Sequence, residues 1–449
     1  MTHRPSCFSP SRRRLLPILC ATTAFSLAAT LTPAVAAPMP IAATQEQTAV
    51  NRTCYDTSVP GTVEEQRLDN ASPGGQPVPP QILERSGFDD DVERFTRILC
   101  ALPGYRPALA VVRAQGDALW TTAIRRAQRT QQTPDLPSTD DRGLYWARIS
   151  MAKALRQWQP RKPLQAAERA ELIRTLEYAS RGITSTRFDH GVRRVLVTGF
   201  DPFTLDADIR IGNPSGANAL SLDGTRWRVN GETVQIQTVV FPVRYTDFDE
   251  GMVEHALAPH YRPGPQRAEL VMTVSQGRVG LFDLEVFNGR RRSVVSIGDN
   301  NNLWGGGTVA APVVAPGMPP GPEWLTSSLP MTEMAATAVP PFRTRVNTSV
   351  LEIPAGQTTP VRRPDGPTPG SIASEGAGGG YLSNEVAYRN TLQRDLLHPA
   401  MPAGHLHVPV LQFGAGNTSE ITDPSYEANR DAIVAGSHAI LRTALTTLP

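Results

Sequence analysis

The sequence has almost no net charge of either sign. Its 449 residues include 44 lysines and arginines and 42 aspartates and glutamates, for a formal net charge of +2. Proteins that bind nucleic acids or anionic membranes concentrate positive charge for that purpose. The charge balance therefore argues against either partner and favours a peptide or a small molecule. It gives no indication of the oligomeric state.

Cysteine is also scarce, with only Cys7, Cys20, Cys54 and Cys100. The first two lie in an N-terminal segment that we expect to be removed. The other two lack the nearby cysteine or histidine spacing of a zinc site. Two cysteines in an exported protein most simply predict a disulfide, here between Cys54 and Cys100. No thiol is then left for catalysis beyond Cys100.

A mostly apolar run, Leu15 to Leu31, follows the basic stretch SRRRLL and precedes the small-residue stretch AVAAP. This order is typical of a secretory signal peptide, so we expect residues 1–36 to be cleaved off after Ala36 and the protein to be secreted or held in the cell envelope. Residues 11–13 loosely fit a twin-arginine signal. An uncleaved anchor is the weaker alternative because the run is short, so we expect no stable membrane insertion.

Residues 37–190 are expected to form a mainly helical N-terminal region. Residues 37–80 are polar with scattered proline and glycine, which predicts a loosely structured lead-in. Apolar residues then recur at three- and four-residue spacing. The region shows no repeat and no catalytic constellation, so its role is open. The predicted helical segments are 90–102, 118–131, 142–158 and 164–180.

Residues 191–449 read as an α/β domain. Apolar, β-branched runs alternate with helical patterns, which predicts a three-layer α/β/α fold with a doubly wound, mostly parallel sheet. Residues 305–322 and 354–370 are rich in proline and glycine and are expected to be linkers or surface loops. The predicted strands are 193–200, 234–243, 268–277 and 405–411.

Candidate site residues follow the first and third of these strands, where ligands bind in open α/β sheets. Phe200 and Phe203 lie in the turn after the first strand, where core packing is the alternative role. Gln276 and Arg278 lie in a glycine-bearing loop. Glu285 follows in an apolar setting, either on an exposed strand face or buried with a partner such as histidine. The arginines at 290–292 are expected to be solvated.

Three histidines, His398, His405 and His407, occur within ten residues. The last two share a face of the final strand because side chains two apart point the same way. The group lacks the helical spacing and the carboxylate of a hydrolytic zinc motif. We therefore expect no metal and no other cofactor.

Ser383 stands in the stretch GGGYLSNEVAY, residues 378–388, at the expected start of a helix. Free amides at a helix N-terminus stabilise negative charge, which suits a nucleophile and an oxyanion. Serine is equally a preferred N-cap residue. The residue pattern alone leaves both roles open.

The order of several motifs resembles the pyroglutamyl peptidase type I family, the pyrrolidone-carboxylate peptidases. The resemblance extends over residues 193–449. Its motifs are VLVTGFDPF, NPS at 213–215, the Gln-Gly-Arg loop with Glu285, GDN at 298–300, GPEWLTSSLP, GGGYLSN and GHLHVP.

The resemblance implies a catalytic triad of Ser383, His407 and Glu285 as nucleophile, base and orienting acid. Ser383 takes the place of the family's cysteine. It lies 24 residues before His407, about the separation that the family shows. Arg278 and the amide of Ser383 are the expected oxyanion donors.

The resemblance also implies a pocket for the pyrrolidone ring. It places Phe200 and Phe203 beside the ring, with Gln276, Tyr381 and Leu382 in the same pocket. The chain departs from the family in its serine, in Thr204-Leu205 after the PF pair, in an apparent insertion near residue 360 and in its N-terminal region. The expected function is an exported hydrolase that removes N-terminal pyroglutamate or a similar group. The alternative is a silent member that binds such peptides.

Overall fold

The structure is a computed structural model that describes residues 54–73, 75–129, 135–292, 297–306 and 311–448. The expected signal peptide, its cleavage point and the twin-arginine motif lie outside these residues. No helix in these ranges combines the length and the apolar character that are needed to cross a bilayer.

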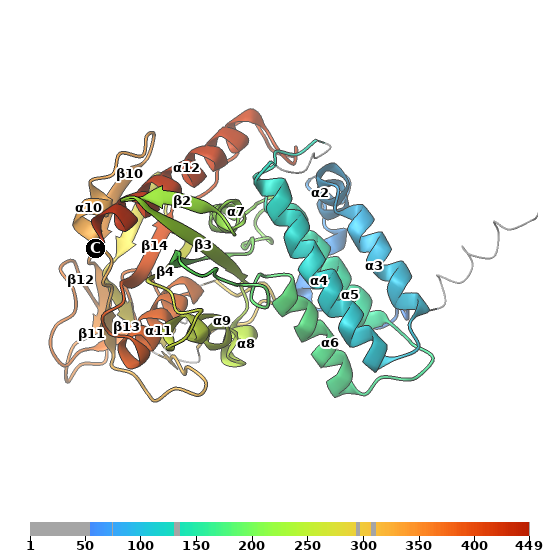
Figure 1. The fold of residues 1–449 in the computed structure, drawn as a ribbon, viewed down its shortest axis with the longest axis horizontal. Helices are drawn as coiled ribbons and strands as arrows, with labels where there is room; N and C mark the ends of the chain where they lie inside the picture. Colours follow the sequence, from blue (N-terminus) through green and yellow to red (C-terminus); the bar gives the residue numbers. More distant parts are fainter. Residues whose placement is uncertain (1–53, 74, 130–134, 293–296, 307–310, 449) are drawn as a thin grey trace, which may run out of the picture. The chain divides into compact units, whose positions relative to one another are not determined.

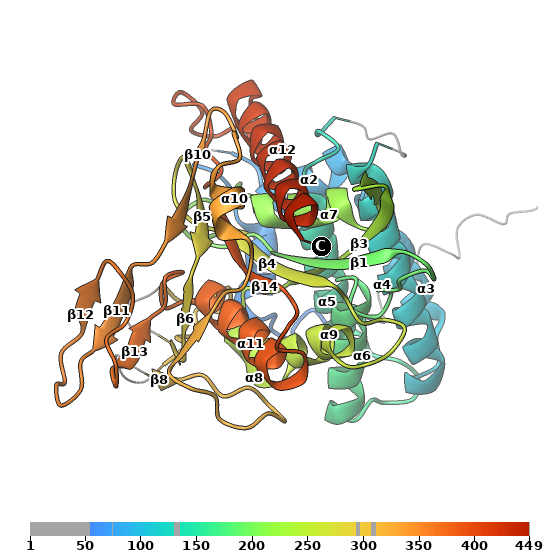
Figure 2. The same ribbon diagram turned by 60° about the vertical axis from the view of Figure 1, so that its left-hand side comes forward.

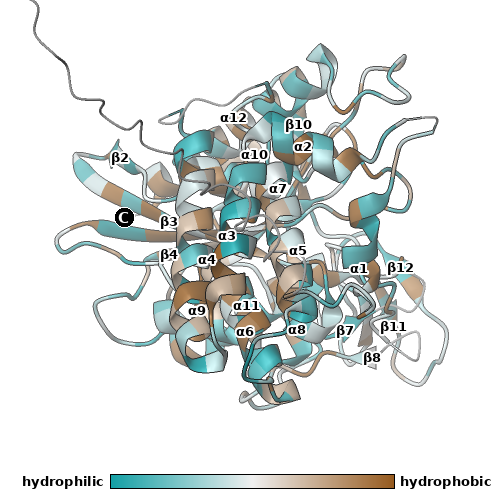
Figure 3. Ribbon diagram, turned by 90° about the vertical axis from the view of Figure 1, so that its right-hand side faces the viewer, coloured by the Kyte–Doolittle hydropathy of each residue, from teal (hydrophilic) through white to brown (hydrophobic). Residues whose placement is uncertain are grey.

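Helices build the N-terminal part, as the apolar spacing predicts (Figure 1). Hydrophobic and hydrophilic residues alternate along α4 and α6 (Figure 3), as expected for helices with one buried face. Helix α5 is more deeply buried, and Trp146 and Leu155 are inaccessible to solvent. The elements are α1 Val63–Gln66, the 3₁₀ helix η1 Arg67–Asp69, α2 Val78–Ser86, α3 Asp89–Ala101, α4 Tyr105–Ala127, α5 Arg142–Gln157 and α6 Ala166–Ala179.

The expectation of a loosely structured lead-in is wrong for its described part. Residues 54–80 contain α1, η1 and the start of α2. Thr62 and Glu65 form a capping box at the start of α1, and Glu64 and Arg67 are buried. Polar composition suggested exposure, but these charged side chains are buried because they find partners elsewhere in the chain.

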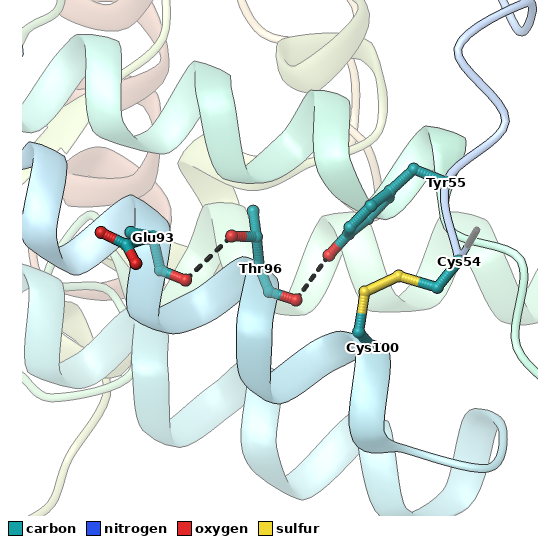
Figure 4. Close-up of a disulfide and its surroundings, with 5 residues drawn as sticks. All are labelled: Cys54, Tyr55, Glu93, Thr96 and Cys100. Atoms are coloured by element: carbon teal, nitrogen blue, oxygen red, sulfur yellow. Dashed lines mark hydrogen bonds between the residues drawn. A yellow bond between two sulfur atoms is a disulfide. The ribbon is translucent and has the colours of Figure 1, made fainter. Parts of the chain in front are cut away.

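The predicted disulfide is confirmed. Cys54 is bonded to Cys100 near the end of α3, with the two Cα atoms 5.6 Å apart (Figure 4). The neighbouring Tyr55 hydroxyl donates a hydrogen bond to the carbonyl of Thr96, at 2.7 Å. Together these links attach the first described residues to α3.

The C-terminal part is built on a seven-stranded sheet in the order β10-β5-β14-β4-β1-β3-β2. All four predicted strands are present, as β1, β3, β4 and β14. These four run parallel, whereas β2 and β5 are antiparallel to β3 and β14. The strands are β1 Arg193–Phe200, β2 Arg226–Val229, β3 Glu232–Phe241, β4 Leu270–Gln276, β5 Leu281–Glu285, β10 Arg343–Asn347 and β14 Ala403–Val408.

Helices cover both faces of this sheet, which confirms the three-layer fold class (Figure 2). Alternate residues of β1 point into two different cores, Val195 and Val197 into one and Leu196 into the other. The first face carries α7 Pro214–Leu222, α10 Met331–Ala335 and α12 Pro424–Thr447, and the second carries α8 Tyr245–Asp249, α9 Met252–Tyr261 and α11 Leu382–Leu397.

Small antiparallel sheets occupy the segment between β5 and α11. The loop prediction for residues 354–370 is partly wrong, because β12 lies inside that range and pairs with β11. Residues 305–322 are largely without regular structure where described, apart from the short β8. The strands are β6 Phe287–Gly289, β7 Arg291–Arg292, β8 Ala311–Pro312, β9 Trp324–Thr326, β11 Val350–Ile353, β12 Val361–Arg363 and β13 Ile372–Glu375.

Candidate active site

A histidine and a glutamate on adjacent strands form a buried pair. His407, near the end of β14, has its Nδ1 atom 2.7 Å from Oε1 of Glu285, the last residue of β5. Glu285 is 1% exposed. Of the two roles open for Glu285, the structure thus shows the buried, histidine-paired one. Because Nδ1 faces the carboxylate, Nε2 is the nitrogen that can accept a proton from another group.

The second oxygen of Glu285 is held by a residue that the sequence analysis missed. Asn347 ends β10 beside Glu285 and donates a hydrogen bond to Glu285 Oε2 at 2.7 Å. The same amide group donates to the carbonyl of Ala377 at 2.9 Å. The sequence carries no clear signal for this residue, because β10 reads Arg-Thr-Arg-Val-Asn and lacks the apolar run that marks a buried strand.

His405 lies beside His407 on β14, with their ring centroids 4.8 Å apart. Both nitrogens of His405 lie 2.8 Å from a hydroxyl, one from Thr273 and the other from Ser275. Burial, and secondarily the nearby His407, lower the pKa of His405 well below its usual range. His405 is therefore a neutral residue that packs behind the pair.

No group of three or more histidine, cysteine, aspartate or glutamate side chains is arranged to hold a metal ion within the described ranges. His398 is the C-cap of α11, whereas His405 and His407 lie on β14.

Ser383 is the second residue of α11, and Tyr381 is the N-cap. The predicted helix start is thus confirmed, but Ser383 is not the capping residue. Its hydroxyl donates a hydrogen bond to the carbonyl of Gly378 at 3.1 Å. Within the described chain it bonds neither to His407 nor to an amide of its own helix. The amide of Ser383 belongs to the first turn, where N–H groups have no partner within the helix.

Two glycines let the backbone close around the imidazole of His407. A Cβ atom added at Gly277 would lie 2.6 Å from His407 Cβ, and one added at Gly378 would lie 3.1 Å from His407 Cε1. Gly378 is therefore adjacent both to the His407 ring and, through its carbonyl, to the Ser383 hydroxyl. The glycine-rich stretch brings the serine and the histidine to one site.

These residues line an open cleft with a volume of about 730 Å³. This volume falls within the ordinary range of ligand sites. Asp283 and Arg278 meet beside it, with Arg278 Nε 3.2 Å from Asp283 Oδ2. The predicted residues that line the cleft are Phe203, Gln276, Arg278, Glu285, Tyr381, Ser383 and His407.

A second, small cavity adjoins the cleft and has a volume of about 30 Å³. Phe200, Phe203 and Leu382 line it together with Gln276, Tyr381 and Ser383, and Asn213 contributes a polar group that the sequence analysis did not predict. Phe200 also belongs to the core, where it stacks on Phe248 at 6.2 Å. The ring of Phe203 lies 6.3 Å from that of Tyr381.

The expectation that the arginines at 290–292 are solvated is wrong. Arg292 is buried and pairs with Glu385 through its Nε at 2.5 Å and with Asp249 at 2.6 Å. Arg291 pairs with Glu323 at 2.6 Å. Glu385 lies one turn into α11, so Arg292 braces the helix that carries Ser383.

Two family models match this chain. One, described as the PA0049 N-terminal domain, matches residues 43–177, and the other, the PA0049 C-terminal domain, matches residues 194–317 and 337–412. "Uncharacterized protein PA0049" of Pseudomonas aeruginosa is 33% identical over 485 residues, which cover 84% of this chain and 88% of that protein. The chain belongs to the PA0049 family.

Among solved structures, this PA0049-family chain is similar to peptidases at low identity. A mutant pyrrolidone carboxyl peptidase from Pyrococcus furiosus is 22% identical, covering 57% of this chain and 100% of that chain, with a TM-score of 0.37. Pyroglutamyl peptidase I from Bacillus amyloliquefaciens is 17% identical, covering 57% of this chain and 96% of that chain, with a TM-score of 0.36.

Proposed function

We propose that this PA0049-family chain is an exported hydrolase that removes N-terminal pyroglutamate, or a similar lactam or acyl group, from peptides. The observation that carries the proposal is the buried His407–Glu285 pair in the same cleft as Ser383. Such a pair supplies a proton acceptor with fixed orientation beside a hydroxyl nucleophile. The motif resemblance over residues 193–449 supports the pyroglutamyl specificity.

In the proposed reaction, the Ser383 hydroxyl turns from the Gly378 carbonyl toward His407 Nε2. His407 takes the hydroxyl proton as the serine oxygen attacks the acyl carbon, and later gives that proton to the leaving amine. Glu285 orients the imidazole and stabilises its positive charge. Arg278 and the amide of Ser383 stabilise the oxyanion. Water then hydrolyses the acyl-serine.

The pyrrolidone ring would occupy the small cavity beside Ser383. At about 30 Å³ this cavity has room only for water, so the ring must push Phe203 and Tyr381 apart. Neighbouring Gln276 and Asn213 then offer polar groups to the lactam, and the aromatic rings contact its faces.

A second candidate is a catalytically silent protein that binds pyroglutamyl peptides. The observation that favours it is the Ser383 hydroxyl, which bonds to Gly378 and not to His407. A protein of this kind would need the aromatic pocket but not the nucleophile.

Hydrolysis of a chromogenic pyroglutamyl amide by the purified mature protein distinguishes the two candidates. We expect turnover that Ser383→Ala abolishes, while Ser349→Ala, a serine on another wall of the same cleft, retains it. Ser383→Cys should keep activity and become sensitive to thiol alkylation, because a thiol beside a histidine reacts as a thiolate.

Wild-type turnover that is unchanged in Ser383→Ala would contradict the assignment of the nucleophile. An inactive wild type that Ser383→Cys activates would identify the silent protein.

A further inference from the structure

We infer that the cleft continues past Ser383 into an arginine-lined arm that binds a carboxylate on the leaving part of the substrate. The inference rests on the proposed function, because only a substrate acylating Ser383 has a leaving part. It names a substrate class, namely short pyroglutamyl peptides with a carboxylate close to the scissile bond.

The arm is formed by elements beyond the His407–Glu285 pair. Arg345 reaches the cleft from β10, and Arg362 reaches it from β12. Strands β10 to β13 lie on the same side of the molecule (Figure 2). The side chain of Arg345 is 42% exposed and that of Arg362 is 60% exposed. Both cations are thus accessible from the cleft.

The acids that face these arginines are less accessible than the arginines are. Asp283, which pairs with both Arg345 and Arg278, is 1% exposed. Glu375 is 17% exposed and lies 3.3 Å from Arg362. The carboxylates of Asp283 and Glu375 are thus largely buried. They are shared by three arginines, Arg278, Arg345 and Arg362, so the surface that this arm offers to a ligand is positive.

The guanidinium groups also have unused donors. Arg345 bonds to Asp283 through Nε, and no hydrogen bond among the described residues uses its terminal nitrogens. A guanidinium presents its N–H groups as a planar fork that matches a carboxylate. The matching carboxylate could be the α-carboxylate of a dipeptide or the side chain of an acidic residue after pyroglutamate.

Four peptides test these sources: pyroglutamyl-alanine, its C-terminal amide, pyroglutamyl-aspartate amide and pyroglutamyl-lysine amide. We expect kcat/KM to be about fivefold higher for a carboxylate-bearing peptide than for the neutral alanine amide, because a partly exposed ion pair typically contributes an effect of this size. The lysine amide should have the lowest kcat/KM. The preference should weaken with salt. A preference for only one of the two acidic peptides identifies the source of the carboxylate.

Arg362→Gln should reduce this preference while hydrolysis of the neutral amide stays unchanged, and Arg345→Gln should also reduce the preference. Arg362→Gln is the main test variant because Arg362 is exposed, whereas Arg345→Gln also removes an ion-pair partner of the buried Asp283. Arg343→Gln, an exposed arginine on β10 outside the cleft, is the matched control and should keep the preference.

Binding of the same four peptides to the Ser383→Ala protein, measured by calorimetry, separates this inference from the proposed function. Tighter binding of an acidic peptide without any wild-type hydrolysis would remove the proposed function and keep the arm. Equal binding and equal hydrolysis of the acidic and neutral peptides, or a preference that survives both arginine substitutions, would overturn the inference.

Discussion

At the scale of single residues, two buried polar groups of the site are each held by two partners. Glu285 is held by His407 and Asn347, and His405 by two hydroxyls. Such pairing offsets the cost of burying a polar group. The buried carboxyl of Asp141 has only one oxygen with a partner. Its Oδ2 accepts a hydrogen bond from the backbone N–H of Asn213 at 2.9 Å, whereas its Oδ1 has no partner among the described residues.

Burial, and then the charge of Asp140, raise the pKa of Asp141 to about 7. In the unfolded chain the ordinary value is roughly 4. Between these values the folded protein holds a proton that the unfolded chain has lost, so this carboxyl makes folding less favourable as pH rises through that window. Above about pH 7 its contribution is constant.

We therefore predict that Asp141→Asn, which cannot ionise, becomes more stable relative to wild type between about pH 4 and pH 7. Differences of a few kcal/mol are expected at about 1.36 kcal/mol per pKa unit. Thermal melts of both proteins across this range measure the effect, with the exposed Asp365→Asn as the control. A pH-independent difference in Tm would show that Asp141 does not titrate in this window.

At the scale of elements, the glycine-rich stretch before α11 fits closely against β14 and β6. Asn384 in the first turn of α11 accepts a hydrogen bond from the Gly289 amide at 2.9 Å and donates to its carbonyl at 2.8 Å. The helix start is thereby fixed against β6. The preceding glycines then decide how close the Ser383 hydroxyl comes to His407.

Gly378→Ala should lower kcat/KM at least about tenfold because its methyl group would lie 3.1 Å from the His407 ring, and small displacements of a catalytic group are costly. Gly379→Asn is the matched control. Its added Cβ meets no heavy atom within 4 Å, and asparagine tolerates the positive φ of +85° at that position. Hydrolysis rates and melting temperatures of both variants should show the loss of activity in Gly378→Ala only. Equal losses in both variants would assign the effect to backbone strain.

The main elements could be predicted because their signals are local. Apolar periodicity located α3, α5 and α6 and the C-terminal part of α4, which begins at Tyr105 and not near residue 118, and β-branched runs located β1, β3, β4 and β14. The motif resemblance led to the pairing of His407 with Glu285, but Asn347 could not be predicted, because it meets Glu285 only through the pairing of β10 with β5. The burial of Arg292 likewise depends on Glu385, 93 residues away. The composition of residues 290–292 does not show which charged side chains from elsewhere in the chain pack against them.

At the scale of the whole molecule, the N-terminal helices hold the turn that carries Phe203. Asp201, between Phe200 and Phe203, is bound by Arg148 of α5 at 2.9 Å and by Arg181 at 2.6 Å. The next residue, Pro202, accepts a hydrogen bond from Asn300, which also donates to Glu64 of α1. The sequence left the role of this region open, and its division at residue 190 stays a prediction. From these contacts we predict that the region positions the pocket.

A substitution in α5 should therefore weaken substrate binding in the pocket. Arg148→Lys keeps the charge but loses the guanidinium fork that joins Asp201 to Ser180. We expect a loss of about 1–3 kcal/mol in stability, typical for hydrogen bonds to a charged group. KM for the pyroglutamyl amide should rise about tenfold, equivalent to 1.4 kcal/mol of binding, with a smaller effect on kcat.

Arg126→Lys separates positioning from stability. Arg126 is equally buried, but its hydrogen bonds go to carbonyls at 136, 138 and 140, all within the helical region. It should lower the melting temperature as Arg148→Lys does and leave KM unchanged. If both variants raise KM in proportion to their loss of stability, the helices only stabilise the fold. A rise confined to Arg148→Lys would mean that they also set the position of Phe203, since Arg148 alone of the two reaches the turn after β1.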